Sequence, residues 1–307
     1  MNSNASPSQS DVWSDWLLHT RHADDPEQER ALHAELEQHA DRVLDGARLA
    51  SGMTLADIGS GDGLIALRAI NRIGPSLRVV MADISEPLLR HAEALAVQRD
   101  VRDQCTFVQC SADALKGIDD ASVDAVTTRA VLAYVPDKIA ALREFHRILR
   151  PGGRISIAEP ILRDDAFEAS SLKTFVDALP PESDEPFFRL LHRWKVAQFP
   201  DTEEKISASP LTNYSERDLV RFALDTGFAD IHMEFHIDVR PSAVTSWEVL
   251  LGTSPHPWAP SLGVILAEQF TVEERQFFEQ VFRAHVEGRQ LVTAERTAYL
   301  TATKTMR

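Results

Sequence analysis

Short runs rich in β-branched residues alternate with amphipathic helical segments from residue 54 onward. The strand-like runs are TLADI, RVVMAD, CTFVQC, VDAVTT and RISIAEP, the last of which ends at residue 160. Strands joined through helices pair in parallel, because the chain must cross back over the sheet before it can run in the same direction again. The alternation therefore predicts an α/β fold whose core is a parallel sheet with helices on both faces.

The turn after the first predicted strand is rich in glycine and has the sequence LADIGSGDG, residues 55–63. Gly59, Gly61 and Gly63 permit a tight turn into a helix and leave bare backbone against which a ligand can lie. Asp57 and Asp62 belong to the same turn, and their charges oppose a phosphate at the helix N-terminus. The dinucleotide fingerprint G-x-G-x-x-G also fails here, because its third glycine would fall on residue 64, a leucine.

A ligand that carries positive charge and no phosphate suits this turn better than a dinucleotide. S-adenosylmethionine has an ammonium group, a sulfonium group and an adenosine, and it has no phosphate. Asp83 ends the next predicted strand 24 residues after Gly59, where its carboxylate can accept hydrogen bonds from both ribose hydroxyls. NAD also presents a ribose, so Asp83 indicates a nucleoside without choosing between the two cofactors.

Five segments between about residues 50 and 160 resemble, in order, the motifs of the class I S-adenosylmethionine-dependent methyltransferases. They are LADIGSGDG, VVMADIS, CSADAL, SVDAVTTRAVLAYVPDK and ILRPGGRISIAEP. The resemblance implies a Rossmann-like seven-stranded mixed sheet with helices on both faces, in which the last strand is antiparallel and lies beside the fifth. It also implies that S-adenosyl-L-methionine is the cofactor, with Ile84 against the adenine and Ala112 and Asp113 at the adenine edge.

The residues expected at the cofactor, from the turn, from Asp83 and from the resemblance together, are Arg21, Asp57, Gly59, Ser60, Gly61, Asp83, Ile84, Ala112, Asp113 and Arg129. Arg129 follows the fourth strand at the edge of the sheet where ligands gather, and its guanidinium can bind the methionine carboxylate or an anionic substrate. Arg21, with Trp16, is expected to close over the methionyl end. A structural ion pair is the alternative for Arg129, and a packed helix end is the alternative for Arg21.

Two further residues are hypotheses for substrate contacts: Glu159 at the end of the fifth strand, and Tyr214 just before a helix. No catalytic residue is assigned. Methyl transfer from a sulfonium is an in-line displacement with a neutral leaving group, so positioning and exclusion of water matter more than a nucleophilic side chain. A general base is needed only for an acceptor that must lose a proton.

The segments outside the core divide the chain further. Residues 1–10 predict a disordered tail, residues 11–50 an N-terminal helical cap, and residues 51–162 the cofactor-binding core. Residues 163–212 contain five prolines and predict a helical insertion that serves as a substrate lid. Residues 213–307 are expected to complete the sheet, with strands at 229–239 and in RTAYLTATK, around a second helical insertion at 241–294 whose core includes Phe277, Phe278 and Phe282.

The composition restricts the partners. A net charge of −15, from 32 Lys+Arg against 47 Asp+Glu, provides no basic field for a phosphate backbone, so no nucleic-acid partner is expected. No apolar run approaches the roughly 20 residues that span a bilayer, and no secretory signal is recognisable, so a cytoplasmic location is expected. Cys105 and Cys110 match no zinc spacing, and no metal site is expected.

Three functions remain open from the sequence. The first is an S-adenosylmethionine-dependent methyltransferase that acts on a small molecule or a peptide-like natural product. The second is an NAD-dependent oxidoreductase, against which the missing third glycine argues. The third is a catalytically silent relative that uses the methyltransferase fold as an interaction module. The acceptor atom and the oligomeric state are not predicted.

Overall fold

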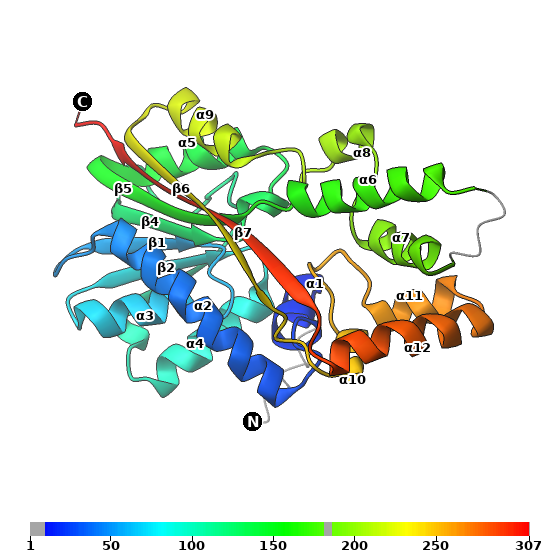
Figure 1. Ribbon diagram of the computed structural model, residues 1–307. Helices are drawn as coiled ribbons and strands as arrows, with labels where there is room; N and C mark the ends of the chain where they lie inside the picture. The colour runs from blue at the N-terminus through cyan, green and yellow to red at the C-terminus, as the bar shows by residue number, and fades with distance from the viewer. Residues whose placement is uncertain (1–9, 181–185, 307) are drawn as a thin grey trace.

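The computed structural model describes residues 10–180 and 186–306 and contains one seven-stranded sheet (Figure 1). The strand order is β3-β2-β1-β4-β5-β7-β6, and β7 runs antiparallel to both β5 and β6, while the neighbouring strands from β3 to β5 pair in parallel. The strands are β1 Thr54–Ile58, β2 Arg78–Asp83, β3 Cys105–Gln109, β4 Val123–Arg129, β5 Leu149–Pro160, β6 Phe228–Pro241 and β7 Val292–Lys304. The predicted mixed sheet with an antiparallel last strand beside the fifth is confirmed.

Helices cover both faces of the sheet, as the alternating pattern requires. In Figure 1, α2 Pro26–Ala47, α3 Leu64–Ile73 and α4 Glu86–Gln98 lie on one side, and α5 Lys138–Ile148 and α9 Glu216–Asp225 lie on the other. Each side has its own buried apolar cluster against the strands. Side-chain caps begin these helices: Asp25 accepts from backbone N–H groups at the start of α2, Ser85 caps α4, and Ser215 forms a capping box with Asp218.

The N-terminal cap is less regular than the two helices predicted over residues 11–50. Its first part is a short helix α1, Val12–Asp15, which continues into a π-helical turn over Trp16–Thr20. Ala23 and Asp24 then adopt left-handed φ angles of 56° and 53°, which reverse the chain before α2. The predicted disordered tail lies outside the described residues, apart from Ser10.

The two helical insertions predicted separately come together in space. The first contains α6 Arg163–Ala178, α7 Pro186–Gln198 and α8 Glu203–Ala208, and the second contains α10 Trp247–Gly252, α11 Leu262–Gln269 and α12 Val272–Glu287. Apolar side chains of α7, α10, α11 and α12 form a third core cluster. Phe278 is completely buried within it, and Phe277 and Phe282 pack against it, so the prediction that these three residues are core is confirmed.

The strands β6 and β7 extend beyond the rest of the sheet. The pairing of β5 with β7 stops at Pro160 and Thr297, whereas β6 and β7 remain paired as far as Pro241 and Val292. Both strands are therefore longer than predicted, and their outer parts form a two-stranded ribbon that leads toward α10 and α12 (Figure 1). The expected apolar face is partly buried as far as Phe235 but exposed at Val239, where β5 no longer continues the sheet.

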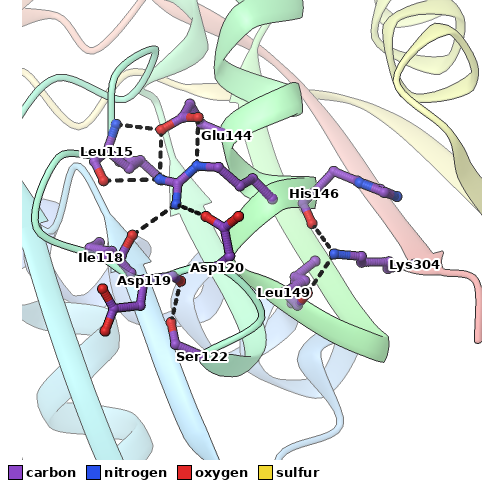
Figure 2. Close-up of polar contacts among 10 residues, drawn as sticks. Leu115, Ile118, Asp119, Asp120, Ser122, Glu144, His146, Leu149 and Lys304 are labelled. Carbon is purple, nitrogen blue, oxygen red and sulfur yellow. Dashed lines mark hydrogen bonds and ion pairs between the residues drawn. The ribbon is translucent and has the colours of Figure 1, made fainter.

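The loop between β3 and β4 is held by one arginine of α5. Arg147 donates to the carbonyl oxygens of Leu115 and Ile118 at 3.0 and 2.9 Å and pairs with Glu144 and Asp120 (Figure 2). Glu144 in turn accepts a hydrogen bond from the Leu115 N–H at 2.8 Å. The network fixes a loop that begins at the carboxyl end of β3, next to the expected adenine site.

No helix within residues 10–180 or 186–306 has the length and apolar composition needed to cross a bilayer.

Candidate functional site

The glycine-rich turn lies at the carboxyl edge of the sheet and is braced by the end of β2. The N–H groups of Gly59 and Ser60 both donate to the carbonyl oxygen of Ala82, at 2.7 and 3.1 Å. Gly59 has a φ of +65°, and a Cβ atom at this position would lie 2.2 Å from Cγ2 of Val131. A glycine is therefore required here both for the backbone conformation and for close packing against the segment that follows β4.

A cavity of about 220 Å³ opens above this turn. Its wall comes from the ends of β1, β2, β3 and β4 and from the N-terminal segment. The lining residues are Trp13, Trp16, Leu17, Arg21, Gly59, Gly61, Asp83, Ile84, Leu88, Cys110, Ser111, Ala112, Arg129, Ala130, Val131, Tyr134, Val135 and Pro136. Seven of the ten predicted cofactor residues are on this wall, and the ligand space lies at the edge where parallel α/β sheets bind ligands.

Asp83 is fixed at the centre of the cavity floor. One carboxylate oxygen accepts from the Gly61 N–H at 2.8 Å, and the other accepts from the Ser85 N–H at 2.9 Å. Burial raises the pKa of this carboxyl, whereas the two backbone donors oppose that rise. Asp83 is thus oriented by both neighbouring turns while its carboxylate still borders the cavity.

A smaller polar recess of about 60 Å³ adjoins the main cavity and is lined by Asp57 and Ser60. Asp57 Oδ1 accepts from the Thr127 hydroxyl at 2.8 Å, but its Oδ2 and the Ser60 hydroxyl have no hydrogen-bond partner among the described residues. Burial raises the pKa of Asp57 to about 7. Buried polar atoms without partners are costly, so this recess is suited to a ligand that supplies hydrogen-bond donors.

Arg21 and Arg129 border both spaces. Neither guanidinium has a carboxylate within ion-pair distance among residues 10–180 and 186–306. Burial lowers the pKa of both arginines, and Arg129 lowers the pKa of Arg21 further, to about 10. The predicted alternative of a structural ion pair for Arg129 therefore finds no partner in the described part of the chain.

The N-terminal segment forms the roof of the cavity and touches both the core and the lid. Ser85 donates to the Asp11 carboxylate at 3.0 Å, and the indole N–H of Trp16 donates to the Ser254 carbonyl at 3.1 Å. Trp13 packs edge-on against Tyr134 and Trp258, with ring centroids 5.2 and 5.9 Å apart. These contacts hold the N-terminal segment over the side of the cavity opposite the sheet.

The two predicted substrate residues have structural roles instead. Glu159 is fully buried and off the cavity wall, where it accepts from the N–H groups of Val131 and Ala133 at 3.0 and 3.3 Å. Burial raises its pKa to about 7. Tyr214 is also fully buried, and its hydroxyl donates to the Pro160 carbonyl at 2.9 Å.

Asp113 is the one predicted cofactor residue that borders neither space. Its carboxylate accepts from the Ser111 hydroxyl at 2.5 Å. The preceding residue, Ala112, does line the cavity. Ala112 therefore borders the space expected for the adenine, while the Asp113 carboxylate is bound within its own loop.

Sequence reasoning missed Trp13, Tyr134 and Cys110 as wall residues. Tyr134 lies five residues beyond Arg129, in the short 3-10 turn Leu132–Tyr134 that follows β4. Its position after a strand at the ligand edge was a usable signal. Burial raises the pKa of Tyr134 well above its usual value, so its hydroxyl stays protonated and can donate a hydrogen bond.

One group of potential metal ligands occurs among the described residues: Glu35, His39 and Glu295, whose ligand atoms lie within 4.8 Å of one another. Arg240 pairs with both carboxylates, at 2.7 Å from Glu295. His39 also pairs with Glu295, at 2.7 Å. The arginine supplies positive charge to the two carboxylates, so the group joins α2 to the β6–β7 ribbon.

The chemistry of these spaces fits S-adenosylmethionine. A buried carboxylate oxygen without a partner suits an ammonium group, a guanidinium suits a carboxylate, and Asp83 is placed for a ribose. Ile84 and Ala112 give the other end of the cavity an apolar wall for a base. Among the described wall residues, only the two arginines could donate hydrogen bonds to a diphosphate as a cluster. Both lie beside the acidic turn, whose charges oppose a diphosphate.

Comparisons with known proteins agree with this geometry. Residues 56–157 match the family model described as "Methyltransferase domain". The chain is 36% identical over 117 residues to the ubiquinone/menaquinone biosynthesis C-methyltransferase UbiE of Hahella chejuensis, which covers 38% of this chain and 47% of the relative. It is 34% identical over 148 residues to the nocamycin O-methyltransferase of Saccharothrix syringae, or 47% of this chain and 52% of the relative.

The chain thus spans about half the length of the curated relatives it matches. Among solved structures, the YcgJ protein of Bacillus subtilis aligns with a TM-score of 0.55 and 16% identity, over 87% of this chain and 99% of that protein. At this sequence identity, the structural similarity supports the fold and nothing about function. The family model covers residues 56–157, and the N-terminal segment and the two helical insertions lie outside it.

Proposed function

The core of this chain belongs to the class I S-adenosylmethionine-dependent methyltransferases, and on that premise we propose that the chain transfers a methyl group from S-adenosylmethionine to a small molecule or a peptide-like natural product. The observation that supports it most is the continuity of the two spaces at the sheet edge. They share Arg21, Gly59 and Arg129 and together offer a nucleoside site and an amino-acid site in one crevice.

Each part of the donor has a counterpart in this crevice. Asp83 would accept hydrogen bonds from the ribose hydroxyls, with Ile84 and Ala112 against the adenine. Asp57 Oδ2 would accept from the ammonium group, and Arg129 would bind the methionyl carboxylate. The nicotinamide alternative has no such match, because the acidic turn opposes a diphosphate.

The donor, when bound, supplies an electrophilic methyl group on a sulfonium. The chain's own contribution is to hold the acceptor in line with that methyl group and to keep water out. Trp13 and Trp16 close the roof, and Val135 and Pro136 complete an apolar wall. Tyr134, whose hydroxyl stays protonated, would orient a polar atom of the acceptor by donating a hydrogen bond to it.

Calorimetry with S-adenosylhomocysteine and with NAD tests the cofactor. We expect the first to bind and the second not to bind at high micromolar concentration, and the opposite result would refute the proposal. Asp83→Ala should weaken S-adenosylhomocysteine about 10- to 100-fold, since hydrogen bonds to a charged group contribute roughly 1.5–3 kcal/mol. Asp238→Ala is the control, because Asp238 is exposed on β6 and borders neither space, and it should change the affinity by less than about threefold.

A methyl-transfer assay separates an enzyme from a silent relative. S-adenosylmethionine labelled in its methyl group is supplied with panels of phenols, quinones, carboxylates and peptides, and transfer of the label to an acceptor is measured. Label transferred by the wild-type protein and lost in Asp83→Ala would support catalysis. Tight binding of S-adenosylhomocysteine without transfer to any of the panels would favour the interaction module.

A further inference from the structure

The cavity and its polar recess offer two arginine side chains to bound anions. S-adenosylmethionine carries a single carboxylate, together with two positive groups. Arg21 and Arg129 both border the cavity and its polar recess, and neither has an ion-pair partner among residues 10–180 and 186–306. Asp62 compensates part of both charges, but a guanidinium with no carboxylate in hydrogen-bond reach is still suited to bind an anion.

The register of the sheet assigns Arg129 to the donor. Asp57 of β1 pairs with Thr127 of β4, so the turn that follows β1 lies beside Arg129 at the end of β4. Arg129 therefore belongs to the amino-acid end of the donor site.

Arg21 belongs to the N-terminal segment and not to the sheet that carries Arg129. The π-helical turn closes with a hydrogen bond from the Arg21 N–H to the Trp16 carbonyl at 2.8 Å, and the Arg21 guanidinium lies 4.9 Å from the centre of the Trp16 ring. Extra residues in a helical turn often mark functional positions. Tyr134, on the cavity wall after β4, packs against Trp13 of the same N-terminal segment, with ring centroids 5.2 Å apart. Arg21 is thus carried by the roof and lies over Trp16, whereas Arg129 is carried by the sheet.

We propose that the acceptor carries a carboxylate or another group of single negative charge, which Arg21 binds while Arg129 holds the carboxylate of the donor. This inference rests on the proposed function and adds the class of acceptor to it. An arginine fork gives a carboxylate two parallel hydrogen bonds, and the apolar walls around it are suited to the rest of a flat or hydrophobic molecule. The combination selects a hydrophobic acid over its neutral analogue.

The first test separates the two arginines. S-adenosylhomocysteine and its analogue without the carboxylate are titrated into the wild type, Arg129→Gln and Arg21→Gln. Arg129→Gln should weaken S-adenosylhomocysteine at least 10-fold and leave the analogue within threefold. Arg21→Gln should leave both ligands within threefold, which also shows that this variant is folded. If Arg21→Gln weakens only the carboxylated ligand, and as much as Arg129→Gln does, both arginines serve the donor and the inference is wrong.

The second test uses matched acids and amides on the protein saturated with S-adenosylhomocysteine: 4-hydroxybenzoate with 4-hydroxybenzamide, and 1-naphthoate with 1-naphthamide. The wild type should bind at least one acid 10-fold more tightly than its amide. Arg21→Gln should abolish that preference without weakening the amide, and Arg21→Lys should restore part of it. Arg283→Gln, on α12 and away from the cavity, should behave as the wild type.

Equal binding of acids and amides by the wild type, or no binding of any of the four compounds up to 10 mM, contradicts the inference. Failure of S-adenosylhomocysteine itself to bind the wild type would instead contradict the proposed function. The two failures are therefore distinguishable within one set of titrations.

Discussion

The affinity for S-adenosylhomocysteine should depend on the protonation of Asp57. Its pKa is about 7 because it is buried, with one oxygen bound to Thr127 and the other unpartnered. An ammonium group binds the ionised carboxylate, so protonation competes with the ligand. With a pKa of about 7, the apparent Kd at pH 5 should exceed that at pH 8 by about 100-fold, which corresponds to about 2.7 kcal/mol.

Isothermal calorimetry at intervals of half a pH unit measures this dependence directly, and proton uptake by the buffer reports it independently. Asp57→Asn should bind weakly and with a flat profile, because it cannot ionise. Glu159→Gln should retain the wild-type profile, since Glu159 has a similar pKa but lies off the cavity wall. A wild-type affinity that is constant from pH 5 to 8, or that improves in acid, would refute the reasoning.

Three further predictions concern stability and the roof. Gly59→Ala should lower the free energy of unfolding, measured by urea denaturation, by about 2–4 kcal/mol, because its Cβ would lie 2.2 Å from Val131 at a positive φ. Gly52→Ala has a φ of +84° but open space around the Cβ, so it should lower the free energy of unfolding by only about 1 kcal/mol. Equal losses in the two variants would contradict this prediction. Glu159 is protonated in the folded state up to about pH 7, so the free energy of unfolding should fall as pH rises from about 4.5 to 7, by at most about 1.4 kcal/mol per pH unit. Glu159→Gln should reduce that slope, and a steeper slope in the variant would contradict the prediction. Trp13→Ala removes ring contacts with Tyr134 and Trp258, so trypsin should cleave after Arg21 severalfold faster than in the wild type. S-adenosylhomocysteine should slow that cleavage. An unchanged cleavage rate in the variant would show that these contacts do not hold the roof.

The central sheet could be predicted from the sequence because its signals are local. Each core strand is a short apolar run, and caps such as Ser85 and Ser215 mark the helix starts between or after them. The glycine turn and Asp83 were identifiable because backbone conformation and strand ends require these residue types at fixed positions. These features depend on a few residues close together in the chain.

The remaining features depend on contacts between distant segments. The roof is a π-helical turn, and its apolar spacing resembles that of an ordinary helix, so only its packing against Tyr134 and Trp258 distinguishes it. The third core cluster combines α7 with α11 and α12, which no periodicity could pair. Glu159 was assigned to substrate from its position at a strand end, but its carboxylate serves the backbone after β4, a requirement that only the folded structure reveals.

The central claim is that one crevice at the sheet edge binds the whole of the methyl donor. A crystal structure of the protein grown with S-adenosylhomocysteine tests it most directly. The ribose should lie on the Asp83 carboxylate, the adenine between Ile84 and Ala112, and the amino-acid end over Gly59 with its ammonium group on Asp57. An S-adenosylhomocysteine molecule bound elsewhere, or bound here with its ribose away from Asp83, would contradict it.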